Sequence, residues 1–91
     1  FLIHSNKIRN QKNEILAQMD KNAFNFLMKS GRYRLETNNI IGAYSEFKLA
    51  YKINQGNKEL NQLLSETLNI LCYNNADYCN ELDEFTQNEE H

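Results

Sequence analysis

The sequence predicts an all-α fold, a bundle of three to four antiparallel helices of which the first is long. Proline is absent from the 91 residues and glycine occurs only three times, so long stretches of chain contain no helix breaker. Apolar residues recur at intervals of three and four, which is the spacing of one helix face. A chain of this length forms one domain and buries only about 60–65% of its unfolded surface.

The first helix is expected from about residue 5 to residue 30. Its apolar positions recur at three, four or seven and are Ile8, Ile15, Met19, Ala23 and Phe26 or Leu27. The helix can continue through Gly31 to Glu36 and so become one long helix. Thr37-Asn38-Asn39 then forms a turn, and any of its three residues can cap the next helix.

Three further helices follow, separated by turns at 55–57 and 73–75. The second is expected from about Ile40 to Ile53, and the third from Lys58 to Cys72 with Asn57 as its cap. The apolar face of the third helix consists of Leu60, Leu63, Leu64, Leu68 and Leu71. A short fourth helix runs from Ala76 to about Phe85 and shows Cys79, Leu82 and Phe85, and residues 86–91 form a polar, frayed tail.

Small residues mark a close crossing of the first two helices. Ala43, Phe47 and Ala50 stand at i, i+4 and i+7 and therefore share one helix face. Gly31 would be the matching gap on the preceding helix, where glycine lets two axes approach to roughly 8 Å. Because glycine costs a helix about 1 kcal/mol relative to alanine, it needs a packing reason. Alternatively, Lys29-Ser30-Gly31 is a C-cap signal and Gly31 simply ends a helix.

This pattern resembles one tetratricopeptide repeat (TPR), in which a glycine is followed by Ala-x3-Phe-x2-Ala and a helix stop. The resemblance covers about 34 residues. The matching positions are Leu27, Gly31, Ala43, Phe47, Ala50 and Ile53. The chain departs from the family pattern at Ser30, Arg34 and Gln55, where a large apolar residue, a tyrosine and a proline are usual. A single match of this kind also arises by chance in three-helix bundles.

The resemblance implies a division of the single domain, residues 1–91, into a TPR-like repeat at about 24–57, capping helices at 58–85 and a tail at 86–91. It also implies that a ligand lies on the face of the first helix of the repeat. Carried over by spacing, the partner-binding positions are Asn25, Met28, Arg32, Leu35 and Glu36. Equally, these residues can contact the N-terminal part of the long helix or solvent.

Charge is segregated along the chain. All ten lysines and arginines lie between Lys7 and Lys58, where four acids oppose them and leave +6. From Glu59 onward eight acids and no base give −8. The two halves either form solvated faces of a monomer or attract each other, within one chain or between copies. Nucleic acid is not favoured as a partner, because the lysines and arginines are dispersed along the chain and the acidic half repels a polyanion.

The sequence contains no recognisable catalytic, cofactor or metal motif. His4 and His91 sit in the terminal segments, away from any cysteine, serine or carboxylate motif. A glycine-rich phosphate loop, an HExxH pair and a CxxC pair are all missing. Glu81, Asp83 and Glu84 are crowded, but they lack the spacing of a calcium loop. The chain is therefore expected not to be an enzyme and to need no cofactor.

Cys72 and Cys79 lie on either side of a predicted turn, so a disulfide between them is sterically allowed. We expect instead that Cys72 and Cys79 are two small, buried residues with free thiols. A disulfide requires an oxidising compartment, so the cysteines leave the localisation open between the cytoplasm, which is slightly favoured, and an extracytoplasmic site.

The first residues, Phe1-Leu2-Ile3, are apolar and lack an initiator methionine. They are either the end of a membrane anchor followed by the positive flank Lys7, Arg9 and Lys12, or an arbitrary boundary. No run of 18 apolar residues forms a complete span. We expect a TPR-like module that binds a protein or peptide partner, and the alternative is a structural helical bundle that self-associates as a homodimer, with or without a membrane tether.

Overall fold

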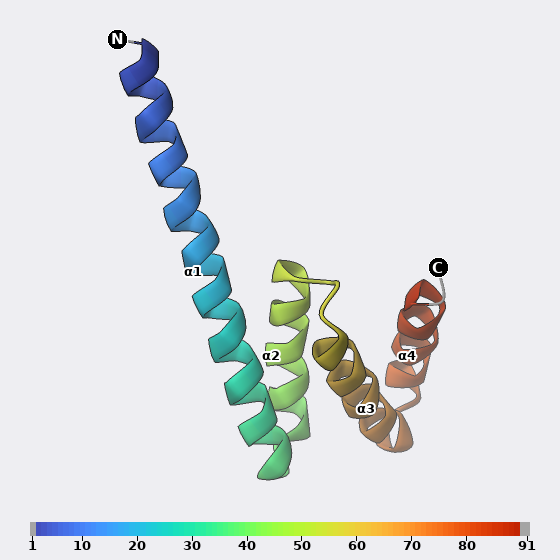
Figure 1. Ribbon diagram of the computed structural model, residues 1–91. Coiled ribbons are helices and arrows are strands. Elements are labelled where there is room, and N and C mark those ends of the chain that lie inside the picture. Colours follow the sequence, from blue (N-terminus) through green and yellow to red (C-terminus); the bar gives the residue numbers. More distant parts are fainter. Residues whose placement is uncertain (1, 90–91) are drawn as a thin grey trace.

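A computed structural model describes the backbone of residues 2–89 and the side chains of residues 15–87 (Figure 1). Over these residues the backbone forms four helices and no strand, so the fold is all-α, as the sequence predicted. The helices are α1 (Leu2–Glu36), α2 (Ile40–Ile53), α3 (Lys58–Asn74) and α4 (Ala76–Glu89). Phe1 and His91 lie outside the described residues.

The helices lie in a row in chain order, and successive helices run antiparallel (Figure 1). Helix α1 packs on α2, α2 on α3, and α3 on α4. Because α1 has 35 residues and α2 has 14, the N-terminal part of α1 extends well beyond the end of α2 (Figure 1). This extension makes the molecule elongated, with principal extents of 60, 31 and 19 Å.

Asparagine side chains set the starts of α2 and α3. The Gly42 amide donates to Asn39 Oδ1 at 3.1 Å, and the Leu60 amide donates to Asn57 Oδ1 at 2.9 Å. Each cap satisfies an amide that the first helical turn leaves without a backbone partner. Asn38 has φ 68°, in the left-handed region, which asparagine tolerates better than most residues. Polar turns therefore divide the chain into short helices that can fold back on one another.

The crossing of α1 and α2 is built on Gly31. A Cβ atom at Gly31 would lie only 2.5 Å from Cε1 of Phe47, so the ring lies directly against the glycine. Phe47, Ala43 and Ala50 are fully buried. The structure thus brings together the four residues from which the sequence predicted a close crossing. Gly31 lies inside α1, so the alternative that it ends a helix is wrong.

The core continues from this crossing into α3. Leu60, Leu64, Leu68 and Leu71 of α3 are buried, as expected for the leucine face, and Leu63 is half-buried. Thr67 is fully buried among them, and its Oγ1 donates to the Leu63 carbonyl at 2.6 Å. Helix α4 adds half-buried Tyr78, Leu82 and Phe85, two of which stack edge-on against Tyr44 and Tyr51 of α2.

Two predicted boundaries are wrong. Helix α1 begins at Leu2, before residue 5, and α4 continues to Glu89, so most of the predicted tail is helical. Proline and glycine are absent from 86–89, and Thr86 Oγ1 bonds back to the Leu82 carbonyl at 2.8 Å. A polar composition by itself therefore does not end a helix that lacks a stop residue.

Candidate partner-binding surface

The predicted partner-binding positions on α1 do not form one accessible face. Asn25 and Glu36 are exposed, Arg32 is partly exposed, and Leu35 is half-buried against the core. Met28 is 4% exposed and belongs to the core, so its prediction as a ligand contact is wrong. The physical reason is helix geometry, because Met28 lies three residues before Gly31 and so faces α2 with it.

Arg32 already has a partner within the molecule. Its Nη1 lies 2.5 Å from Oε1 of Glu59 at the start of α3, and both side chains are substantially exposed. This ion pair links the basic and acidic halves of the chain. Arg32 therefore holds α1 beside α3 and is less free to bind a peptide than the sequence suggested.

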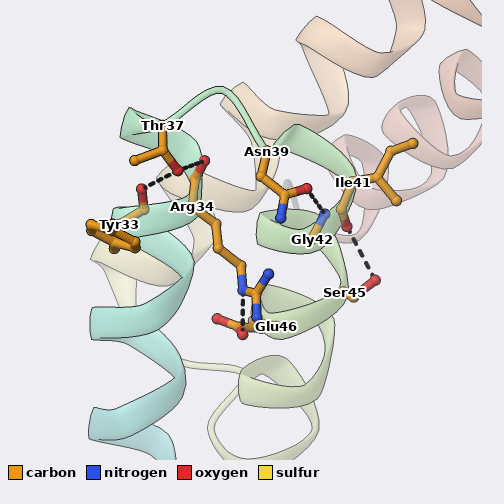
Figure 2. A network of polar contacts seen from close by, with 8 residues as sticks. All are labelled: Tyr33, Arg34, Thr37, Asn39, Ile41, Gly42, Ser45 and Glu46. Atoms are coloured by element: carbon orange, nitrogen blue, oxygen red, sulfur yellow. Dashed lines mark hydrogen bonds and ion pairs between the residues drawn. The ribbon is translucent and has the colours of Figure 1, made fainter.

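A second polar contact fastens α1 to α2 (Figure 2). Arg34 Nε donates to Oε1 of Glu46 at 2.7 Å, and the Glu46 side chain is only 15% exposed. Close by, Thr37 Oγ1 donates to the carbonyls of Tyr33 and Arg34 at the end of α1. The Arg34–Glu46 contact joins α1 to α2, and the Thr37 bonds stabilise the turn between them. Together they help to fix the orientation of α1 relative to α2.

The side of α1 that faces away from α2 carries four large apolar residues. We call them the outer stripe; they are Ile15, Met19, Phe26 and Tyr33. Their side chains are 59–67% exposed. At about 100° per residue, the four fall within roughly 40° of one another and lie opposite Phe24, Met28 and Gly31. No other described helix covers this side, since α2 packs on the opposite face (Figure 1).

The described side chains in the part of α1 that extends beyond α2, from residue 15 to residue 23, are exposed on all sides. Every residue from Ile15 to Ala23 is exposed, including Leu16 at 50%. An isolated helix in water has little stability of its own, and most helices in proteins depend on packing an apolar face. Residues 15–23 therefore make no such packing contact within the described part of the chain.

A shallow cleft lies on the other side of the molecule, between α2 and α4, with a volume of about 340 Å³. Tyr44, Tyr51 and Phe85 line it, together with Lys48 and Lys52 on α2 and Glu81 and Glu84 on α4. The Tyr44 hydroxyl donates to Glu81, and Lys48 Nζ lies 5.1 Å from the Tyr44 ring centroid. The polar groups of the cleft partly satisfy one another.

The structure joins Cys72 of α3 to Cys79 of α4 by a disulfide, with the two Cα atoms 4.6 Å apart. The free thiols that the sequence favoured are therefore not what the structure contains. The bridge spans the turn between the two helices. It holds α4, whose apolar contacts are only half-buried, against α3.

The described part of the chain lacks two other kinds of site. No three or more histidines, cysteines and acids gather there as a metal site would require. No described helix is long and apolar enough to cross a membrane. The side chain of His4 and the whole of His91 lie outside the described residues.

No protein-family model matches this chain, and neither a curated protein nor a solved structure is detectably similar to it.

Proposed function

We propose that this chain is a non-enzymatic, TPR-like module for protein–protein interaction or scaffolding. The outer stripe of α1 is the observation that supports the proposal most strongly. Exposed apolar side chains that gather on one face of a small domain are a feature of binding surfaces, whereas singly scattered ones are normal. Four large apolar side chains, each more than half exposed, lie on one side of α1.

The packing of the first two helices supports the repeat-like part of the proposal. Gly31 lies against the Phe47 ring, and Ala43 and Ala50 are fully buried at the same crossing. Two helical hairpins, α1–α2 and α3–α4, follow each other in a row. Stacked helical repeats need about three units for stability and need capped ends. A unit with two hairpins and one open end is therefore suited to binding a further helix at that end.

The structure changes which residues we propose for binding. The outer stripe replaces Met28 and Leu35, which the core uses. Asn25 and Glu36 remain exposed on the flank of the outer stripe, where they can supply polar contacts at the rim of an interface. Arg32 contributes by holding α1 against α3 through Glu59.

Affinity capture with matched variants tests the proposal. Tyr33→Glu places a charge in the outer stripe, whereas Tyr73→Glu makes the same change on α3 at a side chain that is 93% exposed. We expect a protein bound by the wild-type chain and by Tyr73→Glu to be lost with Tyr33→Glu, while circular dichroism shows equal helix content. Equal capture by all three chains would reject the outer stripe as the binding surface.

A second candidate function is a structural helical bundle that associates with itself. The segregation of charge favours it, since opposite ends of two copies attract each other. The proposed membrane tether depends on Phe1-Leu2-Ile3, whose side chains lie outside the described residues.

A further inference from the structure

The outer stripe has the spacing of a helix that pairs with another helix. Met19, Phe26 and Tyr33 are separated by seven residues each, and Ile15 precedes Met19 by four. In a coiled coil, apolar residues alternate at intervals of three and four, and from Met19 onward the outer stripe fills one of the two seam positions in each heptad, with Asn22 and Lys29 at the other. The occupant that fits this side of α1 is therefore a second helix lying along it.

We propose that this helix is α1 of a second copy of the chain, packed antiparallel to the first. The inference depends on the proposed interaction surface and names its partner. In the register that sets Ile15 level with Tyr33 of the other copy, Phe26 stands level with Asn22. Two-fold symmetry repeats each of these pairs. Met19 comes level with Lys29, whose methylene stem can lie along an apolar side chain.

One charge pair in this register favours a second copy and the antiparallel direction. The same register sets Lys12 of each copy level with Glu36 of the other, so opposite charges meet at both ends of the contact. A parallel pair in register would instead set Lys12 against Lys12. A single sequence that carries both halves of a complementary pair is suited to binding itself.

The shape of the molecule also fits this arrangement. The part of α1 that extends beyond α2 would lie along the half of the partner's α1 that is packed on its own bundle (Figure 1). Both bundles would stay on the outside, because α2 packs on the face opposite the outer stripe. The contact from residue 12 to residue 36 is about 37 Å long at 1.5 Å per residue. Each copy would therefore cover the exposed extension of the other.

Sedimentation equilibrium of charge-swap variants tests the register. We expect the wild-type chain to dimerise, and Lys12→Glu or Glu36→Lys alone to raise the dissociation constant by about tenfold or more, because each converts two attractions into repulsions. The double variant Lys12→Glu/Glu36→Lys should recover the wild-type value. Glu36 is exposed, and circular dichroism checks that all three variants keep the helix content of the wild-type chain.

A wild-type chain that stays monomeric up to millimolar concentration would overturn the inference. So would a double variant that dimerises no better than either single variant. Tyr33→Glu should abolish the dimer and Tyr73→Glu should leave it intact; equal dimerisation of the two would also overturn it. A monomeric wild-type chain whose captured protein is lost with Tyr33→Glu leaves the proposed function standing with a foreign partner. No capture together with no dimer rejects both.

Discussion

At the scale of single residues, Gly31 decides how closely α1 and α2 approach. The Phe47 ring occupies the space that any side chain at this position would need, and it cannot move aside easily because it is fully buried. Glycine inside a helix is a disadvantage of about 1 kcal/mol, and the contact with Phe47 offsets it. At the crossing, the Phe47 ring therefore fills the space that the absence of a side chain at Gly31 leaves.

Enlarging either side of the crossing should destabilise the fold. We expect Gly31→Leu and Ala43→Leu each to lower the free energy of unfolding by roughly 1–3 kcal/mol or more, because overpacking forces the helices apart. Phe47→Ala should cost about 3–5 kcal/mol, because it leaves a cavity. Chemical denaturation measures all three. Ala23→Leu is the matched control, since Ala23 is exposed on α1 and should tolerate leucine. A Gly31→Leu protein of unchanged or higher stability would show that the crossing does not depend on this glycine.

The turn after α1 also depends on single residues. Asn38→Ala should lower stability by about 1 kcal/mol, because alanine disfavours the left-handed backbone found there, whereas Asn38→Gly should not. Asn39→Ala should cost about 1 kcal/mol through loss of the cap on the Gly42 amide. Thermal unfolding of the three variants compares them directly. If alanine and glycine at position 38 gave the same stability, backbone strain would not explain the choice of asparagine.

At the scale of helices, the sequence predicted the number, order and most boundaries of the elements, because turn and cap residues are local signals. The start of α2 at Ile40 and of α3 at Lys58, each after an asparagine cap, are examples. The sequence did not predict which side of α1 meets the bundle. Ile15, Met19 and Phe26 have the spacing of one helix face, yet this face is the exposed outer stripe.

A signal for the correct face was present in the sequence. Counting back from Gly31 by three and seven residues reaches Met28 and Phe24, and both are buried. Helix α1 carries apolar residues on two opposite sides, so periodicity alone cannot choose between them. Only the position of Gly31 identifies the side that faces α2.

The disulfide between α3 and α4 should matter because α4 has few deeply buried contacts. We expect the double variant Cys72→Ser/Cys79→Ser to lower the free energy of unfolding by about 2–3 kcal/mol, since the bridge restricts the unfolded chain. Denaturation of the variant, and of the wild-type chain with and without a reducing agent, measures the loss. If reduction left both the stability and the helix content unchanged, the bridge would not be what holds α4 in place.

At the scale of the whole molecule, association through opposite charges and association through apolar surface depend differently on salt concentration. At ~1 M salt the screening length falls to about 3 Å, so an assembly held by opposite charges should weaken. A dimer held by the outer stripe should persist or tighten. Light scattering at low and high salt separates these cases, and we expect the wild-type dimer to persist. A dimer seen only at low salt would assign association to the segregated charges instead.

Reversal of the acidic cluster gives an independent test of the segregated charge. Glu81, Asp83 and Glu84 lie on α4, at the opposite end of the row from α1 (Figure 1). If α1 provides the interface, changing all three to lysine should leave dimerisation nearly unchanged in sedimentation, although losing the Glu81 contact with Tyr44 can lower stability. Neutralising three α1 lysines, Lys12, Lys21 and Lys29, is the matched comparison. A larger loss of association from the α4 change would point to a head-to-tail assembly.

Hydrogen exchange of the backbone amides tests the central claim most directly, namely that the outer stripe of α1 is the binding surface. Exchange should be measured on the free monomer, and again either with the captured partner or at a concentration that gives the dimer. The account predicts fast exchange in the exposed part of α1 in the monomer, and slower exchange on association that is confined to α1 peptides within residues 12–36. Protection that appears in α3 or α4, with none in α1, would contradict it.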